Sequence, residues 1–156
     1  DLGSIPSPQN SFYLGVGLET LHLRMERHYE NALALAKHLE KHPKVAWVSF
    51  SGLEKDSQHA LAKKYLPNGS CGVISFGVVG GREAAVKFMD SLKLAAIVTH
   101  VADSRTCVLH PASTTHRQMN DEELLAAGVS PDLIRMSVGI EDIQDLIQDV
   151  DQALGK

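Results

Sequence analysis

An apolar residue recurs every three or four positions along the first quarter of the chain, and this pattern limits the fold more than any other feature. The eight residues of the stripe, seven of them apolar, are Leu14, Leu18, Leu21, Met25, His28, Ala32, Leu35 and Leu39. Such spacing is typical of a helix that buries one face. Ser7-Pro8 provides a helix start and Pro43 a stop. The sequence therefore predicts a long connecting helix over residues 7–42, which spans the domain or reaches another one.

The rest of the chain alternates short β-rich runs with amphipathic helical segments. Strands are expected at 45–50, 71–79, 95–101, 106–109 and 133–138, and helices at 59–65, 82–92, 121–127 and 142–154. This order predicts an α+β fold, a two-layer α/β sandwich in which helices cover one face of a small sheet. Residues 1–156 are expected to form a single domain, with 44–156 as its sheet-and-helix body.

Composition restricts the class of partner. The 156 residues carry a net charge of −4, with 44% hydrophobic and 22% charged residues. An acidic chain of this kind lacks the basic surface that nucleic acids or anionic membranes require. Its two cysteines form no CxxC pair. We therefore expect a cytoplasmic domain with free thiols, acting on a small molecule and not on nucleic acid or a membrane.

Histidine pairs are the first candidates for a site. His38 and His42 have the i, i+4 spacing that can chelate a metal, but the sequence places no carboxylate or cysteine to complete the site. His110 and His116 flank a rigid polar loop, and from spacing alone they are expected to fix that loop through hydrogen bonds. No metal site is predicted.

Arg135 is the stronger candidate, because it interrupts a largely apolar strand, residues 133–138. A guanidinium in such a place is costly unless it meets an anion. One interpretation is an internal salt bridge to Glu141 or Asp103. The other is a bidentate site for a substrate carboxylate, which suits arginine's planar geometry. The residue types alone leave both open.

Four motifs stand in order along the chain: Gly17-Leu18-Glu19-Thr20-Leu21, Gly72-Val73-Ile74-Ser75-Phe76, the run Leu109–His116 that contains His-Pro-Ala-Ser-Thr-Thr-His, and Ile134-Arg135-Met136-Ser137-Val138-Gly139-Ile140-Glu141. Together they resemble the C-terminal part of the Cys/Met-metabolism family of pyridoxal-phosphate enzymes. The resemblance covers about residues 2–154. It implies the C-terminal small domain of a fold-type I pyridoxal-phosphate-dependent transferase, most similar to the O-acetylhomoserine sulfhydrylase branch. That branch replaces the acetoxy group of O-acetyl-L-homoserine with sulfide or a thiol, giving homocysteine or methionine.

The resemblance also implies roles for single residues. Arg135 matches the arginine that holds the α-carboxylate of the amino-acid substrate. His100 falls where relatives carry a serine or asparagine that assists this arginine, and Ala102 falls where a glycine is common. Both are departures from the family pattern. Thr106 matches a Ser/Thr position that is expected to be structural.

The family's cofactor, pyridoxal phosphate, is held by a lysine in a Ser-x-x-Lys context within a large N-terminal domain. No lysine of this chain stands in that context. The resemblance therefore implies that the cofactor-binding large domain is absent here, and that neither catalytic nor cofactor-binding residues lie in this segment. Alone, the segment is expected to be inactive. Its implied partners are the missing domain and, in the full-length enzyme, other copies in a homotetramer.

Other functions stay open. Cystathionine γ-synthase, cystathionine γ-lyase and methionine γ-lyase share most of the motifs. A stand-alone module that binds a small carboxylate and regulates a partner would also explain Arg135. A third alternative is an oligomerisation domain whose long helix docks a partner.

Overall fold

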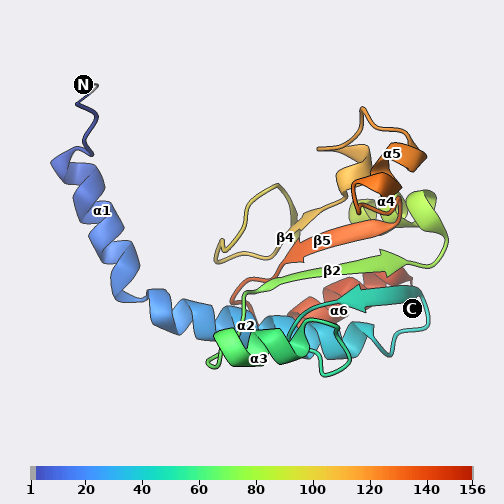
Figure 1. Cartoon of the computed structure of the whole chain (residues 1–156), viewed down its shortest axis with the longest axis horizontal. Helices are drawn as coiled ribbons and strands as arrows, with labels where there is room; N and C mark the ends of the chain where they lie inside the picture. The colour runs from blue at the N-terminus through green and yellow to red at the C-terminus, as the bar shows by residue number, and fades with distance from the viewer. Residues whose placement is uncertain (1–2, 156) are drawn as a thin grey trace.

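The computed structural model describes residues 3–155 as one body with an extended N-terminal arm (Figure 1). The elements in chain order are α1 (Pro8–Glu19), α2 (Leu21–Leu39), β1 (Val45–Ser49), α3 (His59–Tyr65), β2 (Val73–Val78), α4 (Gly81–Ser91), β3 (Ala96–Ile97), β4 (Cys107–Leu109), the 3₁₀ helix η1 (Pro111–Ser113), α5 (Asp121–Ala126), β5 (Leu133–Ser137) and α6 (Ile143–Leu154). The α+β fold class expected from the sequence is confirmed.

The strands form one five-stranded sheet in the order β1-β2-β5-β4-β3. All neighbours are antiparallel except β3 and β4, which run parallel. The strand expected over 95–101 is reduced to Ala96–Ile97 at the edge, and the chain from Val98 to Arg105 is an irregular loop instead. This loop lies beside the central strand β5 and is hydrogen-bonded to it.

The N-terminal segment differs from the single long helix expected over 7–42. The helix begins as predicted, with the Ser7 hydroxyl accepting the Asn10 N–H and Pro8 in the first turn. It stops at Thr20, whose φ of −108° and ψ of 8° are not helical, and α2 starts at Leu21. At the break the Arg24 guanidinium donates to the Gly17 carbonyl, which the end of α1 leaves without a helical partner. Periodicity continues through the break, so apolar spacing could not reveal it.

The helices α2, α4 and α6 pack on one face of the sheet, as expected. Alternate residues of β2 and β5 point into this layer, where Phe76 meets Phe88 of α4 edge to face with 5.7 Å between ring centroids. The sheet residues of this core are Ile74, Phe76, Val78, Val108, Ile134, Met136 and Val138. Burial of this apolar surface fixes which side of β5 faces the helices.

The other face of the sheet carries Arg135. In the register, Ser75 of β2 and Leu109 of β4 flank Arg135, and Val73 and Cys107 flank Ser137. No element comparable to the helical layer covers this face among residues 3–155 (Figure 1). The fold thus presents an arginine on the less covered side of a rigid sheet.

None of the helices in the described part of the chain has both the length and the apolar character needed to cross a membrane.

Candidate substrate-binding face

One nitrogen of the Arg135 guanidinium is hydrogen-bonded, and another is buried without a partner among the described residues. Its Nη2 donates to the carbonyl oxygen of Thr99 at 2.9 Å, which ties the strand to the 98–105 loop. Its Nε is buried and has no hydrogen-bond partner within residues 3–155. A buried donor of this kind has a cost of about 1–3 kcal/mol unless a partner is supplied. The guanidinium is therefore oriented, with hydrogen-bonding capacity left over for a ligand.

The alternative of an internal salt bridge for Arg135 is wrong for the described residues. Asp103 pairs instead with His100 and Arg105. Glu141 accepts from the backbone N–H and hydroxyl of Thr106 at 2.6 and 2.9 Å. Neither carboxylate forms an ion pair with Arg135 in residues 3–155, so the positive charge on the sheet is not neutralised there.

Thr106 and Glu141 lock the end of β5 to the start of β4. The Thr106 hydroxyl donates to Glu141 and accepts the Gly139 N–H at 2.9 Å, and the threonine is fully buried. Asn31 of α2 adds two donations, to the carbonyls of Gly139 and Glu141. This network agrees with a structural role for Thr106. The part played by Glu141 was missed, because nothing in its sequence context shows that it bonds a residue 35 positions away.

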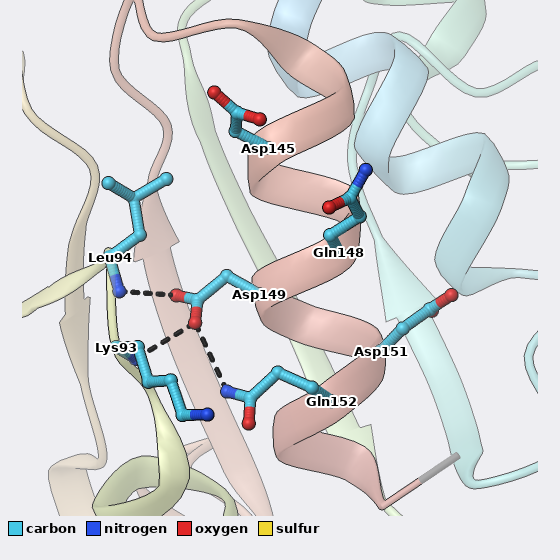
Figure 2. A pocket seen from close by; sticks show the side chains of 7 residues that line it. All are labelled: Lys93, Leu94, Asp145, Gln148, Asp149, Asp151 and Gln152. Atoms are coloured by element: carbon cyan, nitrogen blue, oxygen red, sulfur yellow. Dashed lines mark hydrogen bonds between the residues drawn. The ribbon is translucent and has the colours of Figure 1, made fainter.

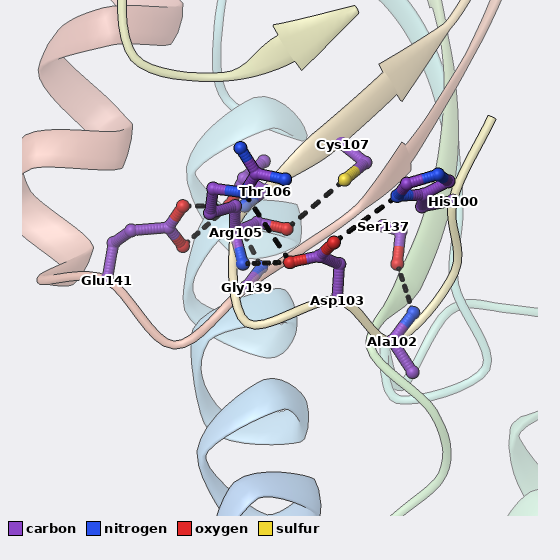
Figure 3. A network of polar contacts seen from close by, with 9 residues as sticks. All are labelled: His100, Ala102, Asp103, Arg105, Thr106, Cys107, Ser137, Gly139 and Glu141. Carbon is purple, nitrogen blue, oxygen red and sulfur yellow. Dashed lines mark hydrogen bonds and ion pairs between the residues drawn. The ribbon is translucent and has the colours of Figure 1, made fainter. Parts of the chain in front are cut away.

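Figure 3 shows how the loop before β4 is arranged beside this network. His100 is exposed, and its Nδ1 lies 3.3 Å from Oδ2 of Asp103. The other carboxylate oxygen of Asp103 accepts the Arg105 backbone N–H at 3.0 Å. That hydrogen bond, followed by the one from His100, holds the pKa of the Asp103 carboxyl below its usual value. Among the described residues His100 contacts Asp103 in this way and no hydrogen bond joins it to Arg135.

Cys107 lies under the same loop. It is a free, buried thiol on the Arg135 side of the sheet and not in the core between sheet and helices. Its S–H donates to the Arg105 carbonyl at 3.3 Å. Burial, and next the nearby Asp103 carboxylate, raise the pKa of the Cys107 thiol. The thiol is thus protonated at neutral pH while nothing binds it.

Ala102 marks the turn of the loop. Its φ is +59°, the one positive φ outside glycine among residues 3–155, and its N–H donates to the Ser137 hydroxyl at 3.0 Å. The resemblance placed a glycine at this position in relatives, and the left-handed backbone gives the physical reason. The hydrogen bond to β5 holds the strained turn in place.

The prediction that the histidines fix this loop through hydrogen bonds is confirmed for the His110 side chain. His110 is buried, its Nε2 donates to the Pro131 carbonyl and its Nδ1 accepts from the Ser113 hydroxyl, both at 2.8 Å. Arg82 of α4 clamps the same loop by bonding the Ala112 carbonyl and the Asp121 carboxylate. The His116 side chain hydrogen-bonds its neighbour Thr115, while its backbone bonds Pro111 and Met119. The loop after β4 is therefore fixed to both α4 and the entry of β5.

At His38 and His42 the expectation that no carboxylate is available is wrong. Asp151 of α6 places Oδ1 2.6 Å from His38 Nε2 and 3.8 Å from His42 Nε2. The aspartate is 113 positions from His38, so sequence spacing could not bring them together.

A hollow lies beside α6, and the polar groups that line it are explained by structural contacts (Figure 2). The buried Asp149 carboxylate accepts the backbone N–H groups of Lys93, Leu94 and Ala95 at 2.8 to 3.0 Å, and also a side-chain amide donation from Gln152. Its acceptor sites are thus used to hold the segment that leads into β3. Nothing in the sequence around Asp149 predicts this role, because its backbone N–H partners lie more than 50 positions away.

No group in the described residues fits the cofactor's covalent attachment. Every lysine between residues 3 and 155 is exposed, and none follows a serine by three positions. The lysine chemistry of pyridoxal phosphate therefore needs residues beyond this part of the chain.

Fold and site together define an α+β domain with an oriented arginine on the less covered face of its sheet. The chain superposes over its full length on 37% of a crystal structure described as an O-acetylhomoserine (thiol)-lyase from Campylobacter jejuni, with a TM-score of 0.91 and 39% identity. That crystal structure contains a pyridoxyl-lysine monophosphate. Residues 1–155 match the family model of the Cys/Met metabolism PLP-dependent enzymes. The chain belongs to this family.

Two curated relatives agree with this family assignment. The homocysteine synthase of Schizosaccharomyces pombe is 56% identical over 99% of this chain, which covers 36% of that protein. The O-acetyl-L-homoserine sulfhydrylase of Leptospira meyeri is 46% identical, again over 99% of this chain and 35% of the relative. The chain spans about a third of the length of these relatives.

Proposed function

We propose that this chain is the substrate-carboxylate-binding part of an O-acetylhomoserine sulfhydrylase. In this reaction sulfide or a thiol replaces the acetoxy group of O-acetyl-L-homoserine, giving homocysteine or methionine. The observation that carries the proposal is Arg135, an oriented guanidinium with a buried unpaired Nε and no carboxylate partner among the described residues. The names of the relatives support the choice of substrate.

Arg135 binds the α-carboxylate and orients the amino acid on the less covered face of the sheet. The Thr99 carbonyl limits the rotation of the guanidinium, so less conformational entropy is lost when the substrate binds. The loop that supplies Thr99 is fixed in turn by Ala102 on Ser137 and by Thr106 on Glu141. Pyridoxal phosphate, when bound by the rest of the enzyme, supplies the electron sink for the reaction.

His100 is proposed to lie at the rim of the substrate position, on the loop that orients Arg135. Its imidazole is exposed and is held by Asp103. The chain contributes orientation and specificity, while the proton transfers belong to the lysine of the large domain. The isolated chain is therefore proposed to be inactive.

The test is Arg135→Lys in the full-length, cofactor-loaded enzyme. Lysine keeps the charge but cannot make the bidentate pair, and a hydrogen bond between charged groups is worth about 1.5–3 kcal/mol, so kcat/KM for O-acetylhomoserine should fall roughly 10- to 150-fold. The loss should appear mainly as a higher KM. Arg27→Lys, a conservative change of an exposed arginine on α2, is the matched control and should leave kcat/KM unchanged. Equal kinetics for both variants would contradict the role of Arg135.

Product analysis separates the sulfhydrylase from the lyases of the family. With O-acetylhomoserine and sulfide, the wild-type enzyme should release acetate and homocysteine in equal amounts. Formation of a 2-oxo acid and ammonia beside acetate, in place of homocysteine, would assign an elimination reaction instead, without affecting the role of Arg135.

A further inference from the structure

Three residues with metal-binding side chains converge beside the sheet, outside the contacts of Arg135. The Nδ1 or Nε2 of His100, a carboxylate oxygen of Asp103 and the Sγ of Cys107 all lie within 4.8 Å of one another (Figure 3). The first two come from the 98–105 loop and the third from the first residue of β4. Imidazole, carboxylate and thiolate are the three side-chain types that zinc binds in proteins.

The spacing of His100 and Asp103 also suits coordination of a single ion. Their Nδ1 and Oδ2 are 3.3 Å apart, at the long end of hydrogen-bond distances. Two ligands about 2.0–2.1 Å from a tetrahedral zinc ion are separated by roughly 3.3 Å. The observed separation therefore equals that of neighbouring ligands on one ion.

The ligand atoms are also oriented before any ion binds. The Asp103 Oδ1 is fixed by the Arg105 backbone N–H, which leaves Oδ2 directed at His100. Cys107 sits on a paired strand, so its Sγ has little freedom. Second contacts of this kind raise the affinity of a metal site because the ligands need little rearrangement.

Charged groups of both signs surround the cluster. The carboxylates of Asp103 and Glu141 raise the pKa of the Cys107 thiol, and the guanidiniums of Arg105 and Arg135 lower it. Arg105 also pairs with Asp103, its Nε lying 3.6 Å from Oδ1. A divalent cation bound to a thiolate and a carboxylate forms a unit without net charge.

We propose that His100, Asp103 and Cys107 form a binding site for a thiophilic divalent cation of the zinc class. The ion takes three protein ligands, and its fourth position is open on the side of the exposed His100 ring. On binding, the Cys107 S–H bond breaks, its proton passes to solvent and the thiolate sulfur bonds the metal. The ion would bridge the loop that carries Thr99 to the first residue of β4.

The experiment uses the full-length enzyme, stripped with a chelator and kept reduced with a phosphine. Zinc bound per chain is measured by mass spectrometry after desalting, and affinity by calorimetry. Wild type should bind one zinc ion per chain at micromolar free zinc. His100→Asn and Cys107→Ser should each lower the affinity by more than the roughly 10- to 100-fold that follows loss of a supporting contact. Cobalt should give the visible bands of a tetrahedral thiolate site in wild type and lose them in Cys107→Ser.

Two control variants make the result specific. Cys71→Ser removes the other free cysteine, which is exposed, and should keep full zinc binding. His38→Asn removes the histidine paired with Asp151 and should also keep it. Because Cys107 is buried, circular dichroism of Cys107→Ser is compared with wild type, and His100→Asn, at an exposed position, repeats the test independently of folding. Failure of wild type to bind zinc, or equal binding by His100→Asn, would overturn the proposal.

Discussion

A single methyl group at residue 102 strains the loop that orients Arg135. Ala102 has φ +59°, which costs an L-residue about 1–2 kcal/mol relative to a right-handed conformation. The turn persists because the Ala102 N–H bonds Ser137 on β5 and because the neighbouring Thr106 is locked to Glu141. The strain thus lies in the segment that carries Thr99 and His100.

Ala102→Gly should therefore stabilise the protein. Glycine adopts positive φ freely but loses about 0.5–1 kcal/mol of backbone entropy on folding, so the net gain should be roughly 0.5–1 kcal/mol. Urea unfolding of the purified protein measures it as a higher midpoint. Ala102→Val is the matched control, because a β-branched residue at this φ should lower the midpoint. A lower midpoint for the glycine variant would show that the turn is not strained.

At the scale of the element, apolar alternation was enough to predict a strand wherever that strand has a neighbour on both sides. Ile74 and Phe76, or Ile134 and Met136, alternate with residues of the other face, so β2 and β5 were predicted within two residues. At the β3 edge the same pattern failed, although it held at the other edge strand, β1. Beyond Ile97 the chain has no further ladder, and the Thr99 carbonyl bonds the Arg135 side chain instead of a strand.

Among the polar residues too, local signals could be read from the sequence and long-range contacts could not. Arg135 stands out as a candidate because a charge interrupts an apolar strand, which is a local signal. Glu141, Asp149 and Asp151 were not found, because each acts on a segment far away in the sequence. Asp149 shows why: on the sequence it is one more polar residue of an amphipathic helix, and only the packing of α6 against α4 brings it to the N–H groups of 93–95.

Asp149→Asn tests this long-range contact between two elements. The amide keeps the shape but turns one acceptor into a donor that faces backbone N–H groups, so we expect a loss of about 2 kcal/mol in the free energy of unfolding. Amide exchange at Lys93, Leu94 and Ala95 should accelerate. Asp145→Asn, an exposed change on the same helix, should stay within about 0.5 kcal/mol of wild type. Unchanged exchange at 93–95 in Asp149→Asn would contradict the assigned role.

At the scale of the whole molecule, α1 is apolar on most of its circumference and has no buried residue. Its exposed apolar side chains are Phe12, Tyr13, Leu14, Val16 and Leu18. A helix that is apolar all round is normally buried, and a contiguous exposed patch marks an interaction surface. Figure 1 shows α1 projecting from the body, which leaves this surface for a further part of the family's longer chain or for a second copy.

The isolated chain should consequently self-associate through α1. Leu14 and Leu18 are each 63% exposed, so changing both to glutamine removes apolar surface without touching the core, and the fraction of dimer and larger species in sedimentation velocity should fall. The matched control changes two leucines of similar exposure on other elements, Leu61→Gln on α3 with Leu125→Gln on α5, and should associate like wild type. If the control lowers association as much as the α1 variant, self-association depends on exposed leucines in general and not on α1, because the two variants remove the same side chains and differ only in their place on the molecule.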